Sequence, residues 1–174
     1  TLVLAVTDNT FSKLSMETTW VALFPGLEIA YSVEPLGVLF ALVASFLWII
    51  TTIYSIGYMR GHNEENQTRF FFCFALSIST VLAICFSANL LTLFIFYELL
   101  TLSTYPLVTH AGTKEAKHGG RVYLGVLLST SIVLFLLAIL GTWVSAGTLN
   151  FTPGGVFTQA HSDSLVALLL VLFC

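Results

Sequence analysis

The chain has 174 residues, of which 57% are hydrophobic and 9% charged, with a formal net charge of −3 and a mean hydropathy of +0.94. Soluble domains carry about 25% charged residues, so this composition excludes a soluble enzyme. No basic stretch is interleaved with aromatic residues, which argues against nucleic acid as a partner. We find no pattern for a nucleotide, flavin, iron–sulfur or metal site. We therefore expect an all-α polytopic transmembrane helix bundle without a cofactor of its own.

Residues 1–35 are expected to form a non-cytoplasmic arm, in which 1–7 fits either the tail of an earlier span or part of the arm. Apolar and polar residues alternate from Leu27 to Val33, and Pro25-Gly26 offers a turn before them. This pattern predicts a short β-hairpin on the membrane surface. At the other end, the chain stops at Cys174 inside an apolar run, so we interpret it as an internal fragment of a longer protein.

A span needs about 20 apolar residues. By this measure we expect four complete spans and part of a fifth after the arm. Residues 70–111 form one apolar run that is too long for a single crossing. Asn89 is its strongest candidate for a helix N-cap, so we place a reversal at Ser87-Ala88-Asn89. The predicted spans are 36–59, 70–87, 89–111, 122–144 and the truncated 165–174.

With that reversal, two loops that hold five of the six basic residues fall on the same side of the membrane. Without it, the two loops would lie on opposite faces. The positive-inside rule then predicts that loops 60–69 and 112–121 are cytoplasmic.

Glu98 lies about 14 Å into the third complete span, close to the middle of a hydrocarbon core about 30 Å thick. A carboxylate at that depth is costly and indicates a functional site. Helical spacing places a polar stripe on its face toward the basic loops: Thr101, Tyr105 and Thr109. His110 lies at the mouth of this stripe. The pattern suits a protonatable group reached by a path from one surface.

Two other groups of small polar residues lie inside spans: Ser129, Thr130 and Ser131, and Cys73, Ser77 and Thr80. They are candidates for the lining of a proton path, Ser129 and Thr130 above all. The alternative is ordinary helix packing, because such hydroxyls often bond the carbonyl four residues earlier. An interfacial position is the simplest interpretation of the histidines at or beyond span ends: His62, His118 and His161.

Several segments carry a resemblance to a known family: YSIGYMRG, TRFFFCFALSIS, SANLLTLFIFYELLTLSTYPLV, RVYLGVLLSTS and GTLNFTPGG. From about Phe24 onward the chain resembles the antiporter-like subunits shared by respiratory complex I and multisubunit cation/proton antiporters. It is most similar to the D-type antiporter subunits, which are also described as proton-conducting membrane transporters. Members of that family have about fourteen helices with two inverted repeats of five. The resemblance implies that this chain holds helices three to six and the start of seven.

The resemblance maps the family's proton-translocating glutamate onto Glu98 and places its partner lysine just beyond Cys174. It implies a proton-translocating subunit of a cation/proton antiporter in the inner membrane of a bacterium. Its partners would be other membrane subunits, the lipid bilayer, protons and, as a candidate, sodium. Some complex I members carry an Arg and an Asp where this chain has Ser129 to Ser131, so those charges cannot be carried over.

Two alternatives stay open. One is a proton-pumping subunit of NADH:quinone oxidoreductase (complex I) or a membrane hydrogenase, in which the redox chemistry belongs to other subunits. The other is a scaffold subunit that organises the membrane arm and conducts nothing.

Overall fold

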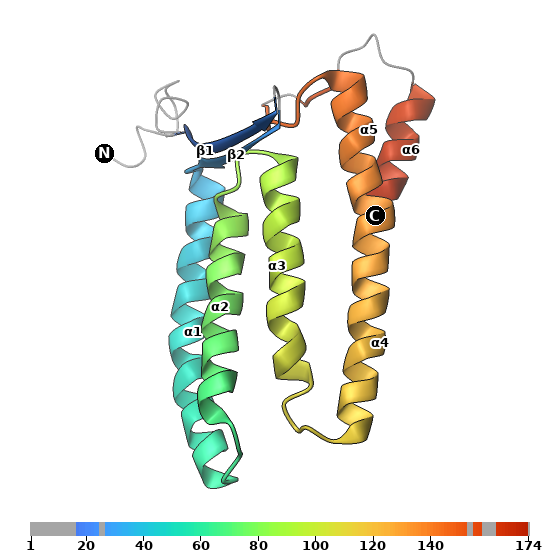
Figure 1. The fold of residues 1–174 in the computed structure, drawn as a ribbon. Helices are drawn as coiled ribbons and strands as arrows, with labels where there is room; N and C mark the ends of the chain where they lie inside the picture. The colour runs from blue at the N-terminus through green and yellow to red at the C-terminus, as the bar shows by residue number, and fades with distance from the viewer. Residues whose placement is uncertain (1–16, 25–26, 153–154, 158–162, 174) are drawn as a thin grey trace, which may run out of the picture.

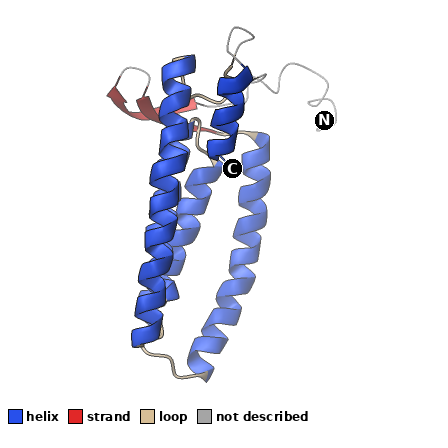
Figure 2. Cartoon of the chain, turned by 90° about the vertical axis from the view of Figure 1, so that its right-hand side faces the viewer, coloured by secondary structure: helices blue, strands red, loops and turns tan. Residues whose placement is uncertain are grey.

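The computed structural model describes residues 17–24, 27–152, 155–157 and 163–173. These residues form a bundle of long helices that run up and down in chain order, with a β-hairpin across one end (Figures 1 and 2). Four helical segments of the described chain are long and apolar enough to cross a bilayer. The predicted all-α polytopic bundle is therefore confirmed, and the chain is a multi-pass membrane protein. The segment 1–7 and His161 lie outside the described residues.

The first three crossing segments are single helices: α1 (Pro35–Gly61), α2 (Gln67–Cys85) and α3 (Leu90–Val108). The fourth runs without a break through three elements: α4 (Lys114–Thr130), the π-helix η3 (Ser131–Phe135) and α5 (Leu136–Ala146). A shorter apolar helix, α6 (Asp163–Phe173), lies beside α5 and corresponds to the start of the predicted fifth span (Figure 1).

The predicted β-hairpin is present. Strands β1 (Glu17–Phe24) and β2 (Leu27–Ser32) pair antiparallel, from Glu17 opposite Ser32 to Phe24 opposite Leu27. The predicted turn residues Pro25 and Gly26 lie outside the described residues. In Figure 1 the hairpin lies across the ends of α1 and α2, next to the start of α3.

Backbone hydrogen bonds join β2 to the reversal between α2 and α3. The amide of Ser32 donates to the carbonyl of Phe86 at 2.8 Å, and the amide of Ala88 donates to the carbonyl of Ala30 at 3.0 Å. The residues between two helix ends would otherwise leave orphan backbone groups, and here a strand satisfies two of them. The structure places this reversal at residues 86–89.

The segment after α5 joins the same reversal from its other side. The amide of Leu90 donates to the carbonyl of Leu149 at 3.1 Å, and the amide of Phe151 donates to the carbonyl of Ala88 at 3.1 Å. Leu149 is buried. Three segments far apart in the sequence are thus tied together at this end of the bundle.

The fourth crossing helix begins eight residues before the predicted start at 122. It is helical from Lys114, and the Thr113 hydroxyl caps it by accepting a bond from the Ala116 amide at 3.1 Å. The predicted loop 112–121 is therefore mostly helix. Lys, Glu and Ala are good helix formers. The polarity of this stretch therefore indicates a polar environment and does not argue against a helix.

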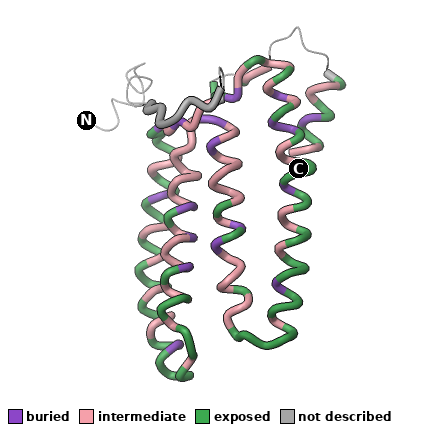
Figure 3. The backbone as a smooth tube through the Cα atoms, in the orientation of Figure 1, coloured by how far each residue is buried: buried purple, intermediate pink, exposed green. Residues whose placement is uncertain are grey.

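The bundle exposes many of its large apolar side chains, above all along the outer face of α1 (Figure 3). Leu39, Phe40 and Phe46 of that helix are each more than half exposed. An apolar surface of this extent is abnormal for a protein in water and normal for one in hydrocarbon. The buried positions instead include many small polar residues, such as Ser77 and Thr101.

Candidate functional site

Glu98 is the ninth of the 19 residues of α3, within one position of the middle of the helix. Both carboxylate oxygens are buried, and no hydrogen-bond partner for either lies within the described parts of the chain. A buried carboxylate without a partner is strongly unfavourable in its charged form. The geometry therefore calls for a proton, water or a further group at Glu98.

The polar stripe beside Glu98 begins with Thr101, whose side chain is 4% exposed. Its hydroxyl donates to the carbonyl of Tyr97 at 3.1 Å, and the Thr109 hydroxyl donates to the carbonyl of Tyr105 at 3.0 Å. Both donors are thus used within α3, as is common for hydroxyls in spans. The oxygen lone pairs of these hydroxyls can still accept bonds from water.

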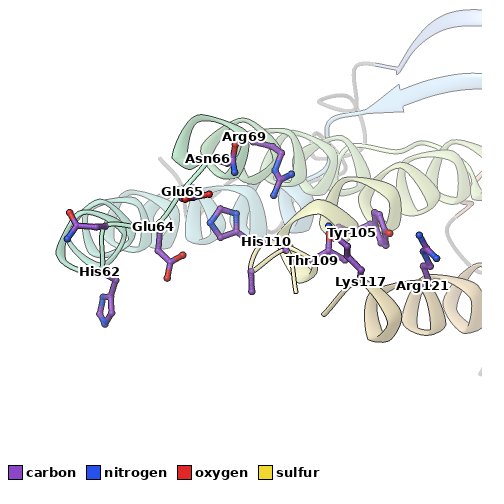
Figure 4. Close-up of a pocket in the computed structure, with 13 residues that line it drawn as sticks. His62, Glu64, Glu65, Asn66, Arg69, Tyr105, Thr109, His110, Lys117 and Arg121 are labelled. Carbon is purple, nitrogen blue, oxygen red and sulfur yellow. The ribbon is translucent and has the colours of Figure 1, made fainter. Parts of the chain in front are cut away.

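The stripe ends at a pocket of about 700 Å³, which we call the polar pocket (Figure 4). It lies between the α1–α2 loop, α2, α3 and α4. The structure brings three of the predicted path residues into its wall: Tyr105, Thr109 and His110. The other lining residues come mainly from the two loops predicted to be basic: His62, Asn63, Glu64, Glu65, Asn66, Arg69, Ala111, Gly112, Lys117 and Arg121. A pocket of this size and polarity can hold several waters.

Gly120 brings α4 against the path residues of α3. A Cβ atom at Gly120 would collide with the side chain of Thr109 and would lie 3.3 Å from the Tyr105 ring. The neighbouring Gly119 has open space at the same position. The close approach at Gly120 therefore fixes one wall of the polar pocket.

The structure does not bring Ser129 and Thr130 to the polar pocket. Both are exposed, and their hydroxyls donate to the carbonyls of Gly125 at 2.6 Å and Val126 at 2.8 Å. Thr130 and Ser131 instead line a second cavity of about 420 Å³ that also touches Tyr97 and the end of α6. This cavity lies on the Tyr97 side of α3.

The π-helix η3 begins beside that cavity. The Leu136 amide donates to the Ser131 carbonyl, five residues earlier, and the Ser131 hydroxyl bonds the carbonyls of Leu127 and Leu128 at 3.0 and 3.2 Å. The ring of Phe135 lies edge-on to that of Tyr97, with centroids 6.0 Å apart. π-helical turns are frequent at functional sites, and no residue pattern in the sequence signalled this one.

Three small residues of α2 that the sequence singled out are buried, and one of them contacts α3. Ser77 and Ser103 are both buried, and their hydroxyl oxygens are 2.9 Å apart across the two helices. Cys73 and Thr80 are buried as well. The sequence did not single out Ser103, because one serine on an apolar helix gives no separate signal.

Within the described residues, no group of three His, Cys, Asp or Glu side chains is placed to hold a metal ion. Cys73 and Cys85 are free thiols. His62 stacks on the ring of Tyr58 at 4.3 Å, and its Nδ1 lies 3.0 Å from the Tyr58 carbonyl. The chemistry that these residues can perform is proton exchange and hydrogen bonding.

Residues 87–174 match the sequence profile of the family described as "NADH:quinone oxidoreductase/Mrp antiporter, TM". Residues 20–71 match a second profile, "NADH-Ubiquinone oxidoreductase (complex I), chain 5 N-terminus". Together the two matches include most of the hairpin, the polar pocket and all of α3.

Individual relatives come from both branches of this family. NAD(P)H-quinone oxidoreductase subunit 5, organellar chromatophore 1, of Paulinella chromatophora is 30% identical over 125 residues, 72% of this chain and 18% of that protein. "NADH-quinone oxidoreductase subunit N" of Desulforudis audaxviator is 28% identical over 149 residues, 85% of this chain and 29% of that protein. "Putative antiporter subunit mnhD2" of Staphylococcus haemolyticus is 29% identical over 157 residues, 86% of this chain and 30% of that protein.

The chain spans less than a third of the length of these three relatives. Because both branches match at similar identity, the greater similarity to the D-type antiporter subunits stays a prediction. The chain belongs to the antiporter-like membrane subunit family of NADH:quinone oxidoreductases and Mrp antiporters.

Proposed function

We propose that this chain forms part of a proton-translocating membrane subunit of a multisubunit cation/proton antiporter and that Glu98 carries the proton. One observation carries the proposal: both Glu98 oxygens are buried and without a partner among the described residues, at the middle of a bilayer-spanning helix. Intramembrane carboxylates are expensive and mark ion pathways and proton relays. Glu98 would hold the proton in its neutral form and release it when a cationic group approaches.

The proposed path runs from the polar pocket to Glu98 along α3. Tyr105, Thr109 and His110 line the pocket, and Thr101 is buried one turn from Glu98. Tyr105 lies seven positions after Glu98, which corresponds to a rise of about 10 Å along the helix. Waters held by the Thr and Tyr oxygens would bridge that length. Ser129 and Thr130 do not line the polar pocket, so we do not include them in this path.

The partners of this subunit would be other membrane subunits, lipids, protons and, as a candidate, sodium. Support comes from the relatives, whose names describe subunits of antiporters and of quinone oxidoreductases. We place the subunit in the inner membrane of a bacterium, with the regions 60–69 and 112–121 in the cytoplasm by the positive-inside rule. The polar pocket would then open to the cytoplasm.

The alternative is a proton-pumping subunit of NADH:quinone oxidoreductase, supported by the relative from Desulforudis audaxviator, whose name describes a subunit of that enzyme. In both cases Glu98 would have the same role. The two proposals differ in the energy source for proton transport, which is a cation gradient in the antiporter and electron transfer in other subunits in the oxidoreductase.

The test is the substitution Glu98→Gln in the full-length parent complex, reconstituted in liposomes. Exchange of protons for cations is driven by a pH gradient and followed with a pH-sensitive dye, after a native gel has confirmed assembly. We expect exchange to fall by at least about a hundredfold, since the amide cannot transfer a proton. Glu115→Gln is the matched control, because Glu115 is an exposed acid in the first turn of α4.

Normal exchange by an assembled Glu98→Gln complex would overturn the assignment. The subunit would then be a scaffold of the membrane arm, and the polar stripe would serve helix packing.

A further inference from the structure

The ring nitrogens of His110 are buried, which its position in the sequence does not explain. It directly follows Thr109, the C-cap of α3, yet both of its ring nitrogens are buried without a hydrogen-bond partner in the described parts of the chain. Its ring packs edge-on against Phe70 of α2, with centroids 5.3 Å apart. An imidazole always has at least one N–H donor. Nitrogens shielded in this way therefore need water or an incoming group as a partner.

Two cavities meet at His110. One is the polar pocket, and the other is a cavity of about 500 Å³ on the α1 side, lined by apolar residues and by Tyr54, Ser55 and Tyr58. His110, Glu64 and Ala111 line both. In Figure 4 the His110 ring is drawn between Glu64 and Arg69. His110 thus forms part of the wall between the two cavities.

The backbone of Glu64 is held firmly at this wall. Its amide donates to the carbonyl of Met59 at 3.1 Å, and its carbonyl accepts from Gln67 Nε2 at 3.1 Å. The same Gln67 nitrogen also reaches the Met59 carbonyl at 3.2 Å, and Met59 is 3% exposed. The α1–α2 loop is therefore fixed at Glu64, which lines both cavities together with His110 (Figure 4).

The charged and titratable groups around the polar pocket, besides His110 and Tyr105, come from the α1–α2 loop, α2 and α4: His62, Glu64, Glu65, Arg69, Lys117 and Arg121. No two of them form an ion pair within 4 Å in the described structure. Tyr54 and Tyr58 of α1 line the cavity on the α1 side together with His110, and Tyr105 of α3 lines the polar pocket with it. Unpaired charges of both signs in one pocket retain water, so the pocket is a place where protons exchange readily.

We propose that His110 loads protons into the path, with Glu64 as the partner of its protonated form. One ring nitrogen takes a proton from pocket water, and the imidazolium is stabilised by the Glu64 carboxylate. The other nitrogen then gives its proton to a water on the Tyr105 side, which leaves a neutral imidazole in its other tautomer. One proton has moved, and a turn of the ring resets the residue. This inference rests on the proposed function, because the delivered proton travels to Glu98.

The first experiment uses His110→Gln in the reconstituted full-length complex, with exchange measured across the range from about pH 5 to pH 8, in which histidine changes charge. We expect exchange to fall by about tenfold or more. Free L-histidine, which is zwitterionic, added on the pocket side should restore part of the rate. A structural role of His110 would give no such rescue. His118→Gln is the matched control, because His118 is exposed on α4 and lines neither cavity.

The second experiment uses Glu64→Gln. Removing the carboxylate takes away the proposed partner of the imidazolium, while the size of the side chain is kept. We therefore expect exchange to fall by about threefold or more. In the His110→Gln background the same substitution should produce no further loss.

These results separate the inference from the proposed function. Wild-type exchange by His110→Gln at every pH, or loss of exchange that L-histidine does not restore, would overturn proton loading by His110. If Glu98→Gln still abolishes exchange in those cases, the assignment of Glu98 stands alone. Unchanged exchange by Glu98→Gln would instead remove the proposed function and this inference together.

Discussion

The two ends of the helix bundle differ in whether their buried polar groups have hydrogen-bond partners within the described chain. At the hairpin end, formed by residues 28–32, 86–92 and 148–151, Asn89 and Thr92 are at most 2% exposed. The Asn89 side chain accepts from the Thr92 amide at 2.8 Å and donates to the Glu28 carbonyl at 2.8 Å, and the Thr92 hydroxyl accepts from the Ala30 amide at 3.1 Å. The hydrogen-bonding groups that join these segments are therefore satisfied by protein.

At the pocket end, formed by residues 62–69 and 105–121, the same kind of group lacks a partner. The ring nitrogens of His110 are buried and unbonded within the described chain, and so are the Glu98 oxygens midway along the same helix. A polar pocket of about 700 Å³ opens beside His110. Satisfied polar networks stiffen a structure, whereas unsatisfied buried groups are costly unless water or a proton reaches them.

This difference suits a path that is open from one side. A carboxylate locked in protein hydrogen bonds would exchange its proton slowly, whereas one without protein partners can exchange it with water. Under the proposed function, the hairpin end seals the start of α3, and the pocket end supplies the protons. Each of the following substitutions tests one side of this comparison through the free energy of unfolding of the full-length protein, measured by SDS-driven unfolding in mixed micelles.

Asn89→Ala should have the largest effect, a loss of about 2–4 kcal/mol. The substitution removes an N-cap and leaves the Glu28 carbonyl and the Thr92 amide without their partner. The control is Asn66→Gly, because Asn66 precedes α2 at a φ of 56° and makes no capping bond with its side chain. An equal loss in both variants would mean that the hairpin end is no more tightly held than the pocket end.

Thr92→Val should cost about 1–3 kcal/mol. The shape of the side chain is preserved, but the Ala30 amide of β2 loses its acceptor in a buried place. Thr104→Val is the matched control, since the Thr104 hydroxyl bonds only the Thr101 carbonyl of its own helix at 2.9 Å. Equal stability of the two variants would show that the contact between β2 and α3 contributes nothing.

The hairpin end was easier to predict from the sequence than the pocket end. Alternation from Leu27 to Val33 indicated a strand, and an apolar run of about forty residues around a single strong N-cap, Asn89, indicated a reversal. Both signals are local. The contact of β2 with that reversal could not be predicted, because it joins residues about 60 positions apart.

At the pocket end, the helical period placed Glu98, Thr101 and Tyr105 on one face of α3, which is again a local inference. The roles of Glu64 and Arg69 as pocket walls depend on how two loops meet in space, and no spacing in the chain encodes that. The start of α4 at Lys114 was missed because the polar stretch before 122 was assigned to a loop by its charge. Charge indicates the surroundings that a segment prefers and not its backbone conformation, so a charged stretch can still be helical.

Gly120→Val should destabilise the pocket end by about 1 kcal/mol, at the lower end of the usual cost of overpacking. The added side chain would collide with Thr109 and press on the Tyr105 ring, but the first turns of α4 can move outward. Gly119→Val is the control, because open space surrounds a Cβ at that position. If both glycines tolerate valine equally, α4 does not fix the pocket wall.

The smallest expected effect lies between the two ends, at the hydroxyl pair of Ser77 and Ser103. These oxygens are 2.9 Å apart, and each hydroxyl also lies within bonding distance of a carbonyl of its own helix, Cys73 at 2.9 Å and Leu100 at 2.8 Å. Because each donor has this second option, removing one serine leaves the other satisfied. A double-mutant cycle with alanine should therefore give a coupling of about 0.6 kcal/mol or less. A coupling well above that value would mean that side-chain hydrogen bonds also hold α2 and α3 together between the two ends. The region of α3 without such bonds would then be limited to the pocket end.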